Sequence, residues 1–204
     1  MRTFLHLRRG ALLAGLLGLL STSSAWAQFP GGPSTNITLT PRQETYMPLN
    51  GGTVVALVQA DDTVSAALPI GFDFKFEGGS YNTVYASSNG FLSFNSFLSS
   101  TKDNDFDLLS SDSQPMLAPL WDDLDGSNGT ASYRTTGAPG SRVFTFEWRN
   151  WKWNRVAASP NISFQVRLYE GTGRFEYAYN NVGSAAVTGD GATIGFINDY
   201  NYVS

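Results

Sequence analysis

One acidic stretch of the chain has the residue types and the spacing of a cation site. Asp123, Asp125 and Asn128 place three side-chain oxygen ligands within six residues, around a turn at Gly126. Ca²⁺ binds several such oxygens from one short loop. The stretch lacks the glutamate that ends an EF-hand loop, and aspartate is also an ordinary capping residue of exposed turns. The sequence leaves both a Ca²⁺ site and a solvated turn open, and it favours the turn.

A second group that could recognise a ligand is aromatic. Trp148, Trp151 and Trp153 lie within six residues of one another. Trp148 continues an alternating apolar face, which predicts that it packs in the core. The alternation breaks at Asn150, so the orientation of Trp151 and Trp153 stays open. They could pack inside the fold, or they could form an exposed platform for a sugar ring or a protein partner.

Two glutamates are the candidates for a hydrolytic pair, because glycoside hydrolysis needs only two suitably placed carboxylates. Glu147 and Glu176 alternate with apolar neighbours, which predicts that both face solvent as ordinary surface residues. The chain has no cysteine, and its single histidine is His6. Beyond that histidine, neither a Ser-His-Asp or Cys-His arrangement nor a zinc site with nitrogen or sulfur ligands can form. We therefore expect no enzymatic activity.

Residues 1–27 have the pattern of a secretory signal peptide. Three arginines among the first nine residues precede an apolar run over residues 11–20, and Ala25-Trp26-Ala27 has the small-x-small pattern of a cleavage site. The apolar run is half the ~20 residues that a membrane-spanning helix needs, and no later stretch is long and apolar enough to cross. We expect a mature chain that begins at Gln28 and is secreted or held at the cell surface.

The charge of the chain argues against nucleic acid as a partner. Three of the 13 basic residues lie in residues 1–27, so 10 basic and 17 acidic residues remain, a net charge of −7. An acidic chain without a basic cluster binds polyanions poorly. The remaining 177 residues are long enough to bury a core without disulfides. An extracellular protein or glycan is the expected kind of partner.

The rest of the sequence predicts an all-β domain with an N-terminal arm. Residues 28–52 are rich in Pro, Gly, Thr and Asn and have little periodicity, so we expect a flexible arm or linker. Over residues 53–204, short runs of β-branched and aromatic residues alternate with turn residues, and the polar residues 99–113 predict a long loop. This pattern is typical of an antiparallel β-sandwich or a barrel-like domain.

The clearest element is a β-hairpin. Residues 162–169 alternate strictly, a short Gly-containing loop follows, and residues 174–179 alternate again. The predicted core positions are Phe164, Val166, Leu168 and Phe175. On the opposite face, Gln165 is expected to be exposed.

Two tripeptides match the acceptor motif for N-glycosylation, Asn36-Ile-Thr and Asn128-Gly-Thr. The motif is short and common, so we interpret both asparagines as turn residues.

An ordered series of blocks carries a family resemblance. The blocks are Leu68-Pro-Ile-Gly-Phe-Asp-Phe-Lys-Phe, Tyr85-Ala-Ser-Ser-Asn-Gly-Phe-Leu-Ser-Phe, Met116-Leu-Ala-Pro-Leu-Trp-Asp-Asp-Leu-Asp-Gly, Phe144-Thr-Phe-Glu-Trp, Phe164-Gln-Val-Arg-Leu-Tyr-Glu and Ala192-Thr-Ile-Gly-Phe-Ile-Asn. The series resembles the nidogen-like (NIDO) extracellular domain, and more closely its versions in bacterial secreted surface proteins. The resemblance implies an interaction module and implies that relatives often carry further domains. Whether further domains follow Ser204 stays open.

Together, these patterns predict a non-catalytic extracellular module for cell adhesion or matrix interaction. Two alternatives remain, a carbohydrate-binding or carbohydrate-degrading module and a structural spacer of a larger surface protein. Exposed rings at Trp151 and Trp153 would favour a binding face over a spacer. A groove with two facing carboxylates would favour the enzyme.

Overall fold

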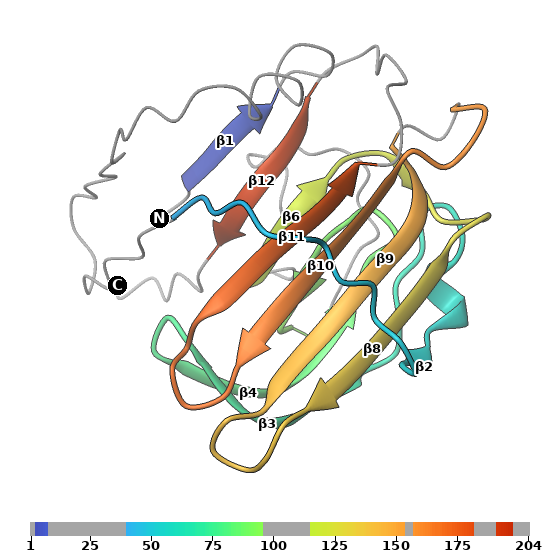
Figure 1. Cartoon of the computed structure of the whole chain (residues 1–204). Coiled ribbons are helices and arrows are strands. Elements are labelled where there is room, and N and C mark those ends of the chain that lie inside the picture. Colours follow the sequence, from blue (N-terminus) through green and yellow to red (C-terminus); the bar gives the residue numbers. More distant parts are fainter. Residues whose placement is uncertain (1–2, 8–39, 96–114, 154–156, 182–190, 198–204) are drawn as a thin grey trace.

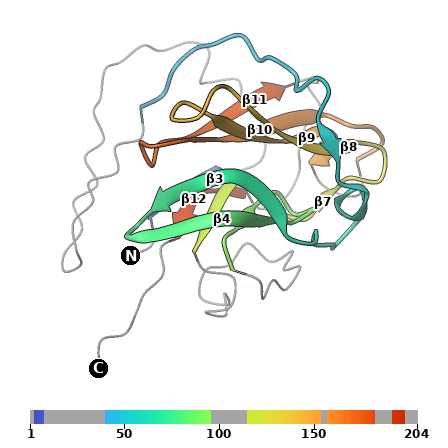
Figure 2. The ribbon, with the colours of Figure 1, turned by 90° about the horizontal axis from the view of Figure 1, so that it is seen from below.

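A computed structural model describes residues 3–7, 40–95, 115–153, 157–181 and 191–197. In this structure, two antiparallel sheets pack face to face (Figures 1 and 2). The prediction of an all-β sandwich is therefore confirmed. Among the described residues, no helix is long and apolar enough to cross a membrane.

The first sheet has the order β1-β12-β6-β5-β4-β3, and the second has the order β11-β10-β9-β8-β2, with β7 paired to β9. The bounds of the strands are β1 Thr3–Leu7, β2 Thr53–Val54, β3 Leu68–Phe76, β4 Gly79–Ala86, β5 Leu92–Ser93, β6 Met116–Trp121, β7 Leu124–Asp125, β8 Thr130–Thr136, β9 Val143–Trp153, β10 Ile162–Tyr169, β11 Phe175–Asn181 and β12 Ala192–Ile197. One short 3-10 helix, η1 (Ala56–Val58), follows β2.

The core lies between the sheets and is strongly aromatic. Along β3, buried apolar residues alternate with exposed ones from Leu68 to Phe76, as a side-chain period of two requires. From the second sheet, the rings of Trp148 and Phe164 stack with their centroids 4.8 Å apart. Strand β6 is buried at every position, so both of its faces are covered.

The predicted β-hairpin is present as β10 and β11, paired in register from Ile162↔Asn181 to Leu168↔Phe175. Three of its expected core residues, Phe164, Val166 and Leu168, are fully buried, and Phe175 is half-buried against the core. The expectation for Gln165 is wrong, because its side chain is only 1% exposed.

An N-terminal strap explains that burial. We use this name for residues 40–52, which run across the outer face of the second sheet, over β11, β10 and β9, to reach β2 (Figure 1). Side chains of the sheet hold the strap by its backbone carbonyls. Gln165 Nε2 donates to Met47 O at 2.8 Å, and Arg134 Nη1 donates to Asn50 O at 2.8 Å. Residues 40–52 of the predicted arm therefore lie against the sheet, while residues 28–39 lie outside the described residues.

Replacing one residue on each face of β10 tests this arrangement. Phe164→Ala removes a ring from the core and should lower the free energy of unfolding by ~3–5 kcal/mol. Gln165→Ala leaves buried acceptors under the strap without a donor and should lower it by ~1–3 kcal/mol. Urea unfolding measures both, with the exposed Thr136→Ala on β8 as a near-silent control. A silent Gln165→Ala would contradict the covering role of the strap.

Candidate functional site

A polar turn lies in the interior of the domain. It spans residues 87–90, Ser-Ser-Asn-Gly, between β4 and β5, and we call it the buried turn. Ser87, Ser88 and Asn89 are all fully buried. Connecting segments normally stay at the surface, because their backbone groups need hydrogen-bond partners. Each polar group of this turn must therefore find its partner within the protein.

The second sheet supplies two of these partners from strand β9. Trp148 Nε1 donates to Ser87 O at 2.9 Å, and Trp151 Nε1 donates to Ser88 O at 3.0 Å. Both tryptophan rings are fully buried. The two indoles thus fill the core with apolar surface and also satisfy carbonyls of the opposite layer.

Two segments of the chain, residues 61–63 and residues 122–125, supply further partners through Asn89 and Ser88. Asn89 Nδ2 donates to Asp62 Oδ1 at 2.8 Å, and its Oδ1 accepts from Leu124 N at 3.2 Å. Ser88 and Thr63 exchange backbone and side-chain hydrogen bonds, each of 2.9 Å. The buried turn consequently holds residues 61–63 beside residues 122–125.

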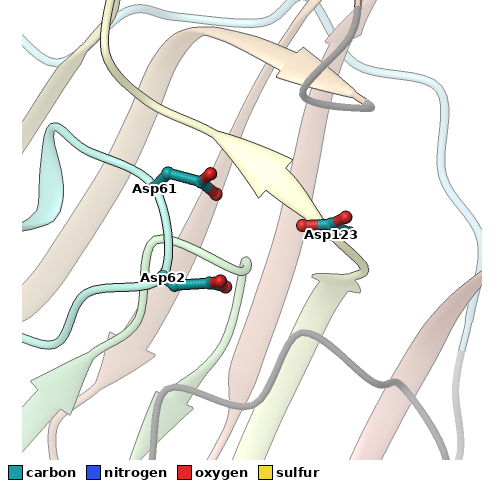
Figure 3. A group of neighbouring side chains, drawn as sticks. All are labelled: Asp61, Asp62 and Asp123. Atoms are coloured by element: carbon teal, nitrogen blue, oxygen red, sulfur yellow. The ribbon is translucent and has the colours of Figure 1, made fainter.

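This juxtaposition gathers three carboxylates. Asp61, Asp62 and Asp123 each offer an oxygen, and these oxygens all lie within 4.8 Å of one another (Figure 3). Asp61 and Asp62 are exposed and Asp123 is half-buried. Carboxylate oxygens are the ligands that Ca²⁺ prefers, so this group has suitable chemistry for a cation. The pattern around Asp123 did not reveal it, because Asp61 and Asp62 lie far away in the sequence.

The other two predicted ligands are not members of that group, although Asp125 forms an antiparallel β-bridge with Asp61. Asp125 Oδ1 accepts from Ser127 N at 2.8 Å and from the Ser127 hydroxyl, and its Oδ2 forms an ion pair with Lys152 Nζ at 3.2 Å. Burial acts to raise the pKa of Asp125, but hydrogen bonds from Ser127 and the contact with Lys152 outweigh it and lower that pKa. Asn128 is exposed. The structure thus joins Asp123 to Asp61 and Asp62, and Ca²⁺ binding stays a prediction.

The aromatic platform is not exposed. Trp151 is fully buried and Trp153 is 4% exposed. Trp153 Nε1 donates to Asp122 Oδ2 at 2.8 Å, and a Cβ built on Gly126 would lie 2.1 Å from the ring of Trp151. Of the two alternatives left open by the sequence, packing inside the fold is therefore the one that the structure shows.

A β-bulge in β9 explains why Trp151 faces the core, as Trp148 does. Two residues of β9 stand opposite one of β10 between the pairs Trp148↔Phe164 and Trp151↔Ile162. Asn150 sits in this bulge with φ +56°, and its backbone N–H donates to Ser163 Oγ at 2.9 Å. The extra residue resets the alternation, so Trp148 and Trp151 share the core face.

Glu147 lies under the strap and not in solvent, contrary to expectation. It is 1% exposed. Its Oε1 accepts from the Tyr46 hydroxyl at 2.8 Å, from Leu49 N at 3.0 Å and from Gln165 Nε2 at 2.8 Å, and its Oε2 pairs with Arg149 Nε at 3.2 Å. Burial, and then the negative charge of Glu147, raise the pKa of Tyr46. The carboxylate therefore fastens the strap to the sheet.

Glu176 is held in the same way on β11, which β10 separates from the β9 strand of Glu147. It accepts from the Tyr169 hydroxyl, forms an ion pair with Arg42 of the strap, and lies 3.4 Å from Arg174 Nη2. Its side chain is 16% exposed. Both carboxylates of the hypothetical hydrolytic pair are thus bound to donors of the fold.

The role of the buried turn can be tested at its glycine. Gly90 has φ +79°, and an added Cβ would lie 2.0 Å from Leu120 O. Gly78, in the β3–β4 turn, has φ +85° and no atom within 4 Å of such a Cβ. Gly78→Ala should lower the free energy of unfolding by only the ~1–2 kcal/mol that a side chain costs in a left-handed backbone conformation. Gly90→Ala adds a clash with the backbone and should lower the free energy of unfolding far more, up to failure to fold. Equal losses in thermal unfolding would contradict the tight packing of the turn.

Ca²⁺ binding can be tested by thermal unfolding in EDTA and in excess Ca²⁺. An ion that binds only the folded state adds ~2.7 kcal/mol at a hundredfold excess over its dissociation constant. Asp62→Asn should weaken this gain if Asp61, Asp62 and Asp123 hold the ion. Asp125→Asn should weaken it if Asp123, Asp125 and Asn128 do. Identical curves for the unchanged protein in both conditions would remove the Ca²⁺ prediction.

Comparisons with known proteins agree with the resemblance seen in the sequence. A family model described as NIDO related matches residues 36–204. Alpha-tectorin of Mus musculus and alpha-tectorin of Homo sapiens are each 34% identical to this chain over 82 residues, which is 40% of this chain and 4% of alpha-tectorin. No solved structure matches. The chain thus spans a small part of these relatives, and it belongs to the NIDO-related family.

Proposed function

We propose that this protein is a non-catalytic extracellular module that acts in adhesion or matrix interaction. Membership of the NIDO-related family supports this proposal, because the resemblance to the nidogen-like domain implies an extracellular interaction module. Family membership concerns the fold first, and function depends on the side chains of the site.

The observation that carries the proposal is that the acidic side chains suited to hydrolysis are engaged elsewhere. Glu147 accepts three hydrogen bonds through one oxygen and pairs with Arg149 through the other. Glu176 is held by Tyr169 and by the arginines around it. A general acid or base needs access to substrate and a proton that it can exchange. Glu147 lacks that access because it is 1% exposed, and both carboxylates are engaged by donors of the fold.

The exposed side chains favour a protein over a glycan as the partner. Sugar-binding platforms use exposed aromatic rings, and Trp151 and Trp153 are buried. Among the described residues, the large exposed apolar side chains are three aliphatic ones, Met47, Val54 and Leu57, and one tyrosine, Tyr179. Tyr179 donates its hydroxyl to Pro119 O at 2.6 Å, which ties the ring to the sandwich. Aliphatic side chains within a polar surface suit contacts with another protein.

The proposed location follows from the N-terminal pattern. Residues 1–27 combine a basic start, a short apolar run and a small-x-small site, which is the layout of a secretory signal peptide. We propose that these residues are removed and that the mature chain is secreted or held at the cell surface.

An activity screen tests the proposal. The secreted protein should show no turnover on a panel of polysaccharides, esters and peptides. Glu147→Gln and Glu176→Gln, with the turn variant Glu77→Gln as a control and circular dichroism to verify folding, show whether any signal depends on the two carboxylates. Turnover that Glu147→Gln or Glu176→Gln abolishes, while Glu77→Gln preserves it, would overturn the non-catalytic assignment.

A further inference from the structure

We propose that, once residues 1–27 are removed, the edge of β12 that β1 occupies pairs two copies of this chain into a dimer with one continuous sheet. The inference rests on the proposed removal of residues 1–27 and adds a self-association surface to the proposed function.

The edge of β12 accepts an antiparallel strand in the structure. Strand β1 pairs with β12 from Thr3↔Phe196 to Leu7↔Ala192 and is the outermost strand of the first sheet (Figure 1). All of β1 lies within the proposed signal peptide. Removing that peptide leaves the outward N–H and C=O groups of β12 without the partner strand that they have here. Such an edge is a template for another strand.

The residues of β12 do nothing to block such pairing. The strand reads Ala192-Thr-Ile-Gly-Phe-Ile and contains no charged residue and no proline. Natural sheets protect their edges with charged residues and proline, together with short edge strands or covering loops. The isoleucines, the threonine and the phenylalanine of β12 also favour strand geometry.

The opposite edge of the same sheet, strand β3, has features that protect it from pairing. Strand β3 carries Asp73 and Lys75 on its exposed positions. Two of its carbonyls accept side-chain hydrogen bonds: Thr135 Oγ1 of β8 donates to Ile70 O at 2.6 Å, and Arg142 Nη1, just before β9, donates to Gly71 O.

The edges of the second sheet are less suited to pairing as well. Strand β2 has only two residues, and β11 carries Glu176. Among the described strands, β12 therefore combines the length and the uncharged sequence of an open edge.

A second copy of β12 is the occupant that fits best. Strand β1 runs antiparallel to β12, and a β12 related by a two-fold axis also arrives antiparallel. Because β12 carries no charge, two copies bring no like charges into opposition. A symmetric pair satisfies both edges at once, whereas an unrelated donor strand would leave the edge open in its absence.

The oligomeric state of the processed chain tests the proposal. The full chain is produced with its own N-terminus in a secreting host, and intact mass identifies the N-terminus of the recovered protein. Light scattering during size exclusion at micromolar concentration should then give twice the monomer mass. A retained leader, or a processed chain that stays monomeric, would overturn the proposal. This readout is independent of the activity screen.

Two further experiments test whether the dimer contact lies on β12. Ile194 is half-buried, packs against the core and lies opposite Leu5 in the β1 register. Ile194→Lys puts a charge on the edge and should give a folded monomer, while Val54→Lys on the exposed β2 should stay dimeric. A synthetic peptide of residues 2–8 should also convert the dimer to a monomer by taking the place of β1. The peptide experiment decides the question if Ile194→Lys does not fold. A dimer that the peptide leaves intact would contradict pairing through β12.

Discussion

The architecture depends on satisfying the backbone of one polar turn inside the protein. Ser87, Ser88 and Asn89 are buried, and an unpaired buried backbone group costs about as much as a lost hydrogen bond. Indole N–H groups from the opposite sheet and two separate loops provide the partners. The turn therefore holds four parts of the chain together: the end of β4, strand β9, residues 61–63 and residues 122–125. Several blocks of the family resemblance meet here, which gives the tryptophans and the Asn-Gly pair a structural role.

A second constraint acts on the outer face of the second sheet, where a strap replaces solvent. A strap without regular structure has backbone groups to satisfy, and the sheet offers side chains that do so, with Glu147 and Gln165 at the centre. A buried carboxylate is tolerated only when it is paired and fully hydrogen-bonded, which Glu147 achieves through Tyr46, Leu49, Gln165 and Arg149. The carboxylates that looked available for chemistry in the sequence thus stabilise the fold. This is why the structure supports an interaction module more than a hydrolase.

The local pattern of the sequence predicted the sandwich and the β10–β11 hairpin well, because a period of two reports directly which side chains face the core. It failed where a second layer covers the other face. Gln165 and Glu147 read as solvent-facing, since alternation cannot distinguish water from a polar strap. It located the break at Asn150 but left the orientation of Trp151 open, because alternation does not show that Asn150, with its left-handed φ, inserts one residue into β9 and turns Trp151 inward. The meeting of Asp61 and Asp62 with Asp123 depends on long-range pairing through Asn89, for which a local pattern carries no signal.

Hydrogen exchange at the buried turn tests its central role most directly. The amides of Ser88, Asp122 and Leu124 donate to Thr63 O, Asn89 O and Asn89 Oδ1. If the turn holds the two sheets and the loops together, these amides can open only when the whole domain unfolds. They should then exchange as slowly as the central amides of β9 and β10 and respond to denaturant with the slope of global unfolding. Fast exchange that is insensitive to denaturant would show that the turn opens locally, and it would contradict the central role of the turn.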